Sequence, residues 1–265
     1  MKNFLPLILL FLLASCGSTA EKTAEKTAEE SSEKVPTYAL DLQEYSEREA
    51  DCSGEECTEV KIVLPFLKGG DTLIAAEVNE KIEDQYRQLI KSRLPEPRST
   101  GPWESLTASF IEGYELFKME FPDDPTSWYL YLEGGESIIV SDTVFTVIVK
   151  DSEFMGGAHG NTATLIQSYS LKDGMRIDFS ERYGARLKEV AEKKFRTHHG
   201  ISASESLNEA GFIFPEEGFI LPDNMGYTDK GLTLIYNPYE VAPYSTGTTE
   251  LVIPISELEV QNVAS

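Results

Sequence analysis

The sequence predicts an α+β fold in which antiparallel sheets carry helices packed on one face. Segments with the two-residue alternation of a half-buried strand occur in both halves of the chain. Segments with apolar residues at helical spacing lie between them. Strands and helices do not follow a strict βαβ alternation, which favours antiparallel sheets over a doubly wound parallel sheet. We expect two consecutive halves, residues 37–168 and residues 169–262.

The first predicted elements are two strands and two helices. Strands are expected over residues 38–49 and 60–66, where apolar side chains alternate along the chain. A helix over about residues 72–92 follows, with Asp71 as its N-cap. A second helix begins near Pro102, since proline suits the first helical position.

The rest of the chain predicts more strands and one more long helix. The β-branched run 138–149 indicates a single well-buried strand. A helix is expected to end at Gly200, because glycine accepts the left-handed conformation of a C-cap. Further strands are predicted over residues 128–132, 161–170, 232–236 and 250–255.

Composition and charge exclude several classes of protein. The chain has 45 Asp and Glu against 23 Lys and Arg, a net charge of -22, so it repels phosphate and no nucleic-acid partner is expected. A hydrophobic content of 41% is sufficient for a folded core. The fingerprints of phosphate-binding loops, dinucleotide-binding folds, zinc proteases and α/β-hydrolases are absent from the sequence. We therefore predict no catalytic residue, no metal site and no cofactor, and we favour a binding protein over an enzyme.

The N-terminus predicts export and lipid anchoring. Residues 1–15 have the pattern of a signal peptide, with Lys2 followed by an apolar stretch too short to cross a bilayer. Leu13-Ala14-Ser15-Cys16 resembles a lipobox, in which Cys16 is lipidated. The alternative is an ordinary secretory signal. The expected location is the cell envelope, with an anchor in a membrane. The outer membrane is favoured because Gly17 does not suggest retention in the inner one.

The segment after Cys16 predicts a flexible tether. Residues 16–36 contain a tandem Glu-Lys-Thr-Ala repeat and no Phe, Tyr, Trp, Leu or Ile, so they cannot form a core. The other two cysteines, Cys52 and Cys57, are expected to form a disulfide in an oxidising compartment. A metal or redox pair is the alternative, and the absence of a nearby His and of C-x-x-C spacing makes it less favoured.

Two segments carry a family resemblance. The first is Gly156-Gly157-Ala158-His159-Gly160-Asn161, and the second is Tyr236-Asn237-Pro238-Tyr239-Glu240-Val241-Ala242-Pro243-Tyr244. Together they resemble an RsiV-like and PdaC-like paired extracytoplasmic domain of unknown function, over about residues 57–260. The first half corresponds to the PdaC-like part and the second half to the RsiV-like part. The resemblance implies an extracytoplasmic binding role, with lysozyme as a ligand. We expect neither sigma-factor signalling nor deacetylation, because the corresponding parts lie outside the resemblance.

The same two segments hold the candidate ligand-binding residues. His159 lies among glycines, which indicates either a ligand-contacting loop or a tight turn that His159 locks by hydrogen bonding. Tyrosines with intervening prolines indicate either rings that stack on a ligand or rings that pack over a sheet edge. Glu240 is predicted to accept a hydrogen bond from the His159 loop. The candidates are Gly156, Gly157, His159, Asn161, Tyr236, Tyr239, Glu240 and Tyr244.

A second pair of histidines is given a structural role. His198 and His199 follow several basic residues near the expected end of a helix. Cationic groups there complement the helix dipole, so both are predicted to face solvent as caps and not to form a metal pair.

The expected function is that of a lipid-anchored envelope module that binds lysozyme or peptidoglycan. The acidic surface would attract a cationic partner such as lysozyme and speed the encounter. One alternative is an envelope hydrolase that uses His159. The other is a structural envelope protein without a small ligand.

Overall fold

The computed structural model describes residues 37–54, 56–94, 100–216 and 218–259. They lie within one compact unit, residues 35–265. The predicted signal peptide, the lipidated Cys16 and the tether lie outside the described residues. None of the helices in the described ranges is long and apolar enough to cross a membrane.

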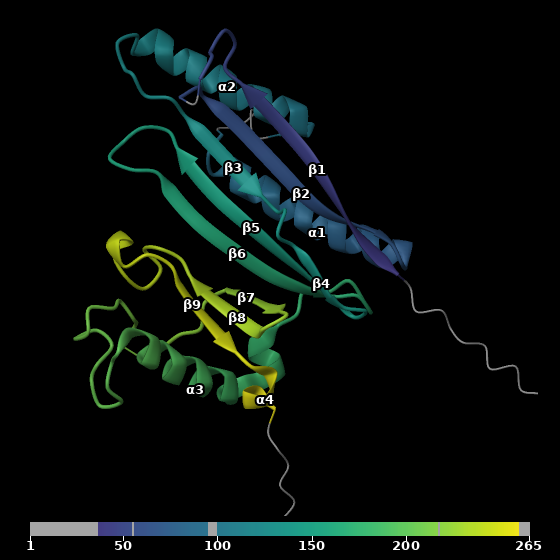
Figure 1. The fold of residues 1–265 in the computed structure, drawn as a ribbon, viewed down its shortest axis with the longest axis vertical. Helices are drawn as coiled ribbons and strands as arrows, with labels where there is room; N and C mark the ends of the chain where they lie inside the picture. The colour runs from purple at the N-terminus through teal and green to yellow at the C-terminus, as the bar shows by residue number, and fades with distance from the viewer. Residues whose placement is uncertain (1–36, 55, 95–99, 217, 260–265) are drawn as a thin grey trace, which may run out of the picture. The chain divides into compact units, whose positions relative to one another are not determined.

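The described residues form one nine-stranded sheet with helices packed against it (Figure 1). The strand order is β1-β2-β3-β5-β6-β7-β8-β9. Strand β4 lies outside this linear order and pairs with β5. The strands are β1 (Tyr38–Arg48), β2 (Glu59–Gly69), β3 (Tyr129–Glu133), β4 (Ile138–Ser141), β5 (Val144–Phe154), β6 (Asn161–Ser170), β7 (Asn224–Thr228), β8 (Gly231–Tyr236) and β9 (Thr249–Ile253). The helices are α1 (Thr72–Lys91), α2 (Trp103–Glu120), α3 (Phe179–His199), α4 (Ile255–Leu258) and the 3-10 turn η1 (Tyr244–Thr246).

The α+β prediction is confirmed, but the sheet arrangement differs from the expected antiparallel sheets. In the described part of the chain, β2 pairs with β3 in parallel and β6 pairs with β7 in parallel. A parallel pair needs a long crossover connection, and α1 with α2 provides the first crossover while α3 provides the second. The second crossover, which leads to the β6–β7 pair, joins the two halves into a single mixed sheet.

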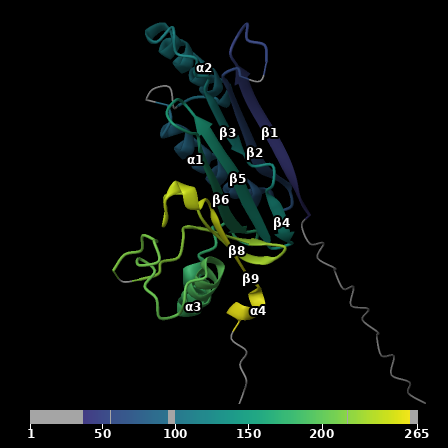
Figure 2. The same ribbon diagram turned by 60° about the vertical axis from the view of Figure 1, so that its left-hand side comes forward.

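The long helices all cover the same face of this sheet, as predicted. Phe145, Val147 and Val149 of β5 face α1 and α2 and join their core. The register pairs Val147 with Gln167 of β6, and Gln167 with Met225 of β7. Met225 packs in a second core beneath α3, so the two cores lie on the same side of the sheet. Figures 1 and 2 show α1 and α2 over the first half and α3 over the second.

The ends of the helices follow the expected capping chemistry. The Asp71 carboxylate accepts hydrogen bonds from the backbone N–H groups of Leu73 and Ile74, so Asp71 is the N-cap of α1 as predicted. Gly200 has a φ of 68° and caps α3, also as predicted. Asp178 caps the start of α3, which begins before the predicted apolar positions and kinks at Gly184.

Two strand predictions require correction. The run 138–149 is not one strand, because a turn at Asp142 and Thr143 divides it into the hairpin β4–β5. Polar residues at this point interrupt the apolar run and form the turn. The high strand propensity of the residues on both sides favoured the prediction of one continuous strand. Strand β7 is not predicted from the sequence, because its residues Asn224–Thr228 include asparagine and glycine, both disfavoured in strands.

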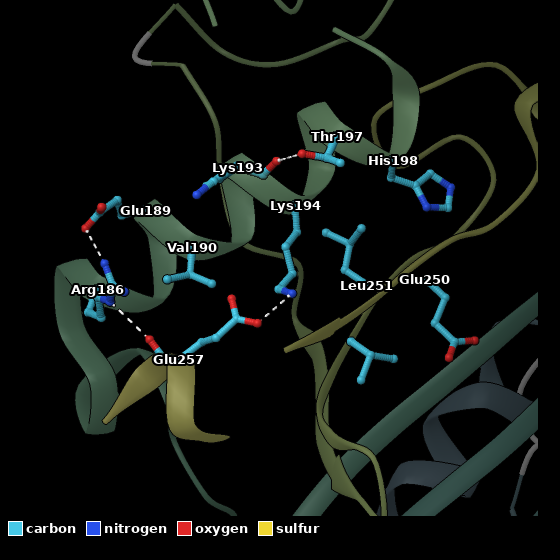
Figure 3. A pocket seen from close by; sticks show the side chains of 11 residues that line it. Arg186, Glu189, Val190, Lys193, Lys194, Thr197, His198, Glu250, Leu251 and Glu257 are labelled. Carbon is cyan, nitrogen blue, oxygen red and sulfur yellow. Dashed lines mark hydrogen bonds and ion pairs between the residues drawn. The ribbon is translucent and has the colours of Figure 1, made fainter. Parts of the chain in front are cut away.

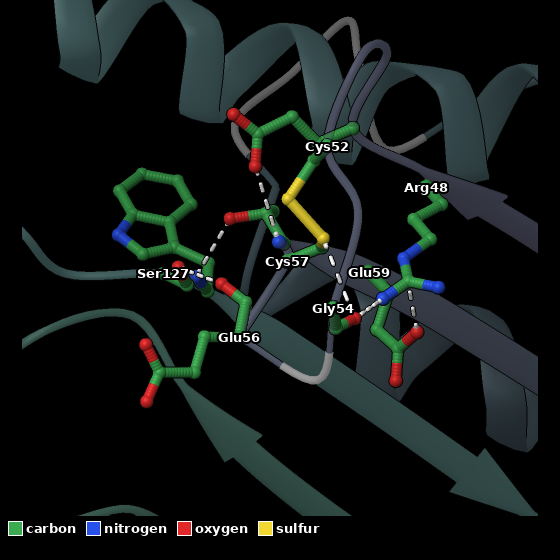
Figure 4. The surroundings of a disulfide bond; sticks show 10 residues. Arg48, Cys52, Gly54, Glu56, Cys57, Glu59 and Ser127 are labelled. Carbon is green, nitrogen blue, oxygen red and sulfur yellow. Dashed lines mark hydrogen bonds and ion pairs between the residues drawn. A yellow bond between two sulfur atoms is a disulfide. The ribbon is translucent and has the colours of Figure 1, made fainter.

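The β1–β2 hairpin is closed by a disulfide (Figure 4). Cys52 and Cys57 are bonded with an S–S distance of 2.04 Å. The backbone carbonyl of Gly54, between them, accepts a hydrogen bond from Arg48. The Ser127 hydroxyl donates to the carbonyl of Glu56, so the loop is also joined to the segment before β3. These contacts give the cysteine pair a structural role at the end of the hairpin.

The contact between the two halves depends on close packing at Gly226 of β7. A Cβ atom at Gly226 would lie 2.5 Å from Cγ1 of Ile166 in β6 and 3.1 Å from Cγ2 of Thr146 in β5. Glycine therefore allows β7 to pack against the strands of the first half at this point.

Substitution of Gly226 with Ala should lower the free energy of unfolding by about 1–3 kcal/mol, since the new methyl group overpacks this contact. Chemical denaturation measures this change. Gly135→Ala is the matched control, because a Cβ at Gly135 meets nothing within 4 Å. Equal stability of the two variants would contradict this role of Gly226.

Candidate functional site

The structure brings the two predicted segments together at the junction of the halves. The loop between β5 and β6 carries His159, and the connection between β8 and β9 carries Tyr244. The two rings stack with centroids 4.1 Å apart and planes at 20°. The Tyr244 hydroxyl donates a hydrogen bond of 3.1 Å to the carbonyl oxygen of Gly160. One tyrosine therefore holds the glycine-rich loop by both its ring and its hydroxyl.

Asn237 fastens the second segment to β6. Its Oδ1 accepts a hydrogen bond of 2.8 Å from the N–H of Thr164, and its Nδ2 donates to the Thr164 carbonyl at 3.0 Å. The amide thus pairs with β6 in the manner of a neighbouring strand. Asn237 is buried, so loss of either bond would leave a polar group unsatisfied.

Glu240 acts as a brace within the second segment. Its Oε1 accepts hydrogen bonds of 3.2 Å from Asn224 and from Asn237. Burial raises the pKa of Glu240, and the two amide contacts oppose this rise. The predicted contact of Glu240 with the His159 loop is wrong. Tyr244 makes that link instead, because the Glu240 carboxylate is directed to the two asparagines.

A hollow of about 230 Å³ lies beside these contacts and is called the junction hollow. The residues that line it include Arg93, Asp151, Glu153, Asn161, Tyr239 and Tyr244. Arg93 follows the end of α1, and the two carboxylates project from β5. The Tyr pair comes from the connection between β8 and β9. Both halves of the chain therefore line this hollow.

A largely buried ion-pair triad forms one wall of the junction hollow. Arg93 Nη2 lies 2.5 Å from Oδ2 of Asp151, and Arg93 Nε lies 2.5 Å from Oε2 of Glu153. The Asp151 side chain is 6% exposed and that of Arg93 is 10% exposed. The guanidinium also donates to the Leu89 carbonyl, which fixes its plane. In this geometry one cation holds two carboxylates at a set spacing.

Asp151 keeps unused hydrogen-bonding capacity. Its Oδ1 is buried and has no hydrogen-bond partner in the described structure. Burial raises the pKa of Asp151, while Arg93 opposes the rise and Glu153 adds to it. A buried acceptor without a partner costs about 1–3 kcal/mol. Oε1 of Gln85 and Nε1 of Trp128 are also buried without a partner in the described residues, but of the three residues only Asp151 lines the junction hollow.

Aromatic rings and a strained residue form the rim. Tyr239 is 61% exposed, and its ring centroid lies 5.6 Å from that of Tyr244. Tyr239 has a φ of 71°, a left-handed conformation that is rare for a residue with a side chain. The bond from its N–H to the Ala242 carbonyl, 3.0 Å long, fixes this conformation. Local strain that holds an exposed aromatic ring in place is typical of ligand-contacting segments.

The other predicted candidates have different places. Tyr236 is buried in the second core, and its hydroxyl donates to the Ile220 carbonyl at 2.7 Å, so it does not face a ligand. Gly156 and Gly157 have positive φ values and open space around them, as a tight turn requires. Asn161 lines the hollow directly.

Arg93, Asp151 and Glu153 are not among the site residues predicted from the sequence. A signal was present, because Asp151 and Glu153 continue the every-second-residue pattern of Phe145, Val147 and Val149. Charged residues at core-facing positions of a strand indicate a paired or functional site. Arg93 carried no such signal, since a basic residue after a helix is common.

A larger hollow of about 460 Å³ lies between α3 and β9 and is called the edge groove (Figure 3). His198 lines this groove and is exposed, as predicted. His199 differs from its prediction: it is partly buried, its Nε2 lies 3.0 Å from Oγ1 of Thr249, and burial lowers its pKa. His199 also packs against Phe195 and Phe212, so it belongs to the edge of the core and not to solvent.

Within the described ranges, no group of three or more His, Cys, Asp and Glu side chains is arranged to hold a metal ion. The chemistry available at the junction hollow is therefore that of carboxylates, amides, a guanidinium and tyrosine rings. Such a set binds ligands through hydrogen bonds and ring stacking.

Comparison with known families gives matches to both halves. Residues 52–162 match the family model described as Deacetylase PdaC. Residues 177–256 match the model described as Protein of unknown function (DUF3298). The chain therefore pairs a segment similar to PdaC with a segment similar to DUF3298. This agrees with the family resemblance seen in the sequence. Asp151, Glu153 and His159 lie in the first matched segment, while Asn237 and Tyr244 lie in the second.

Solved structures share the fold. A DUF3298 family protein from Bacteroides fragilis matches with a TM-score of 0.56 and 16% identity, over 83% of this chain and 91% of that chain. A DUF3298 family protein from Pseudomonas aeruginosa matches with a TM-score of 0.54 and 18% identity, over 84% of this chain and 93% of that chain. The paired segments therefore share a known arrangement, and the likeness extends to the fold alone.

The Arg93 triad should determine both stability and its pH dependence. Arg93→Ala leaves the buried carboxylate of Asp151 and the partly buried carboxylate of Glu153 without their cation, so the free energy of unfolding should fall by about 3 kcal/mol at neutral pH. Burial raises the pKa of Asp151 and Arg93 opposes this rise, so the pKa of Asp151 rises further without Arg93. An acid with a raised pKa in the folded state adds stability as the pH falls, so the loss should be smaller near pH 4.

Chemical denaturation at the two pH values measures this difference. Lys150→Ala is the control, because Lys150 lies on the same strand but pairs with Glu136 in an exposed position. An equal loss of stability for Arg93→Ala at both pH values would show that the carboxylates do not carry the effect.

Proposed function

We propose that this protein is a lipid-anchored binding module of the cell envelope, and that its junction hollow binds a glycan such as peptidoglycan. The observation that carries the proposal is the free Oδ1 of buried Asp151, at a hollow shared by the PdaC-like and DUF3298 segments. A hydroxyl group of the ligand, or a water molecule that bridges the ligand and Oδ1, would supply the missing hydrogen-bond donor.

The rim of the hollow supports a sugar ligand. Sugars present apolar ring faces and a surrounding set of hydroxyl groups. The exposed ring of Tyr239 and the adjacent ring of Tyr244 suit the apolar faces. Glu153 and Asn161 offer acceptors and donors for the hydroxyls. A hollow of about 230 Å³ suits a small portion of a polymer rather than a whole ligand.

The net charge of -22 favours a second candidate ligand, a cationic protein such as lysozyme. Long-range attraction between an acidic receptor and a basic partner speeds association and weakens as salt increases. The geometry favours His159 less as a catalytic base, because in the described structure its Nδ1 contacts the Gly160 carbonyl and its ring stacks on Tyr244. A general base would need a proton to remove and an orienting partner.

Location in the envelope is part of the same proposal. The lipobox-like Leu13-Ala14-Ser15-Cys16 supports processing to a lipidated Cys16, with the outer membrane as the favoured site of attachment. Residues 16–36 would then separate the folded domain from the membrane.

Binding at the junction hollow should depend on the ring of Tyr239 and not on the stability of the fold. Tyr239→Gly should raise the free energy of unfolding by about 0.5–1 kcal/mol, because glycine accepts a positive φ without strain. The same variant should weaken binding of soluble peptidoglycan fragments, and Tyr239→Phe should retain it. Calorimetric titration at two salt concentrations and chemical denaturation measure the two effects.

The outcomes of this titration separate the candidate ligands. Glycan binding that is insensitive to salt and lost in Tyr239→Gly supports the proposal. Lysozyme binding that weakens with salt and is unaffected by Tyr239→Gly would favour the second candidate. Unchanged glycan binding in Tyr239→Gly would show that the junction hollow is not the glycan site.

Lipid anchoring should depend on Cys16 alone among the cysteines. Cys16→Ser removes the acceptor of the lipid, so the protein should leave the membrane fraction and should not incorporate a labelled fatty acid. Fractionation of cells and metabolic labelling measure both effects. The double variant Cys52→Ser/Cys57→Ser is the control and should stay in the membrane fraction. Labelling of Cys16→Ser would contradict the proposal.

A further inference from the structure

The outer edge of β9 has no neighbouring strand within the described residues. The sheet order ends at β9, which pairs only with β8. An edge strand offers its free N–H and C=O groups as a template for another extended chain.

Hydrogen bonding on the far side of β7 shows which backbone groups of β9 are free. The N–H of Tyr227 donates to the Ser168 hydroxyl, so the backbone of Tyr227 is directed away from β8. In an antiparallel ladder this direction alternates from residue to residue. Gly226 and Thr228 are therefore the residues of β7 that bond to β8, through Thr233 and Gly231.

The same alternation continues through β8 to β9. Leu232, Leu234 and Tyr236 are directed to β9, where their register partners are Ile253, Leu251 and Thr249. The backbone N–H and C=O groups of Glu250 and Val252 consequently point away from the sheet. Among the described residues, no loop or helix donates to or accepts from these backbone groups.

The edge groove lies along these free groups. Glu250 and Val252 direct their side chains to one face of the sheet and Leu251 to the other, yet all three line the groove. Residues of both faces can line one hollow only if it follows the edge of the strand. Helix α3 forms the opposite wall, where Figure 3 shows Val190, Lys194 and Thr197.

The wall formed by α3 is cationic in a strongly acidic protein. Helix α3 carries six of the 23 Lys and Arg residues but only three of the 45 Asp and Glu residues. Lys194 pairs with Glu257 and Arg186 pairs with Glu189 (Figure 3). No hydrogen bond or ion pair of the described residues involves the ammonium of Lys193, which lines the groove. Over its whole lining the groove has three Lys and Arg residues and three Glu residues, because Glu250 of β9 and Glu257 of α4 lie opposite the α3 wall. The free ammonium of Lys193 on that wall therefore favours acidic side chains in a segment that lies against α3.

We propose that the edge groove binds an extended acidic segment of a partner protein, which adds to β9 as a further strand. The backbone groups of Glu250 and Val252 supply the main-chain hydrogen bonds. Acidic side chains of the segment lie against α3 and Lys193. This site is independent of the junction hollow, since the two share no lining residue.

The test uses the full chain and a fluorescein-labelled peptide of alternating valine and glutamate, with a valine–lysine peptide as the charge control. Fluorescence anisotropy measures affinity.

Val252→Pro removes an outward N–H without removing a bond to β8, which an edge strand tolerates. It should weaken binding of the acidic peptide by about tenfold or more. Val252→Thr keeps the N–H and should bind within about twofold of the native chain.

A second pair of variants keeps the test informative if Val252→Pro does not fold. Lys193→Glu should also weaken binding, whereas Lys188→Glu makes the same charge change on α3 outside the groove and should bind like the native chain. Hydrogen exchange should show that the acidic peptide protects the amides of Glu250 and Val252. Equal affinity for the two peptides, equal effects of the two lysine variants, or no binding of the acidic peptide would overturn the proposal.

Discussion

The parallel contact between β6 and β7 is the constraint on which the rest of the structure depends. It is short, with Gln167 and Met225 as its register pair, and it is reinforced by the bond from Tyr227 to Ser168. Through this contact the strands that line the two separate cores join into one sheet, which has its long helices on one face. It also brings the connection between β8 and β9 over the ends of β5 and β6. The junction hollow exists because of this placement.

The residues proposed to bind a ligand differ from the core residues in how their polar groups and backbone are satisfied. Aromatic rings that stabilise the fold, such as Tyr236, are buried with their hydroxyl groups paired. Tyr239 instead remains exposed on a strained backbone, and Asp151 retains a free acceptor. Both features reduce stability locally. The contacts of Asn237, Glu240 and Tyr244 hold the segment that carries Tyr239, and Arg93 holds Asp151. Compensation of this kind is expected where a fold carries a preformed site.

The sequence predicted local features more reliably than pairings between distant segments. Helix α1 and its cap at Asp71 follow from patterns within a few residues. The Gly156–Asn161 and Tyr236–Tyr244 segments stood out by composition, and His159 and Tyr244 do meet. The parallel strand pairs, the Arg93–Asp151 pair and the Asn237–Thr164 pair join residues far apart in the chain, with separations of 58 positions for Arg93 and Asp151 and 73 for Asn237 and Thr164. Such contacts leave little trace in local periodicity.

The shared sheet also limits how these two segments can be used as modules. The first matched segment ends within β6, while the strand that covers the edge of β6 belongs to the second. A cut between the segments would leave β6 with a bare, largely buried edge and α3 without its sheet. Recombination that transfers one segment without the other must therefore supply a new cover for that edge. The two segments are therefore coupled through the edge of β6, although each matches a family model of its own.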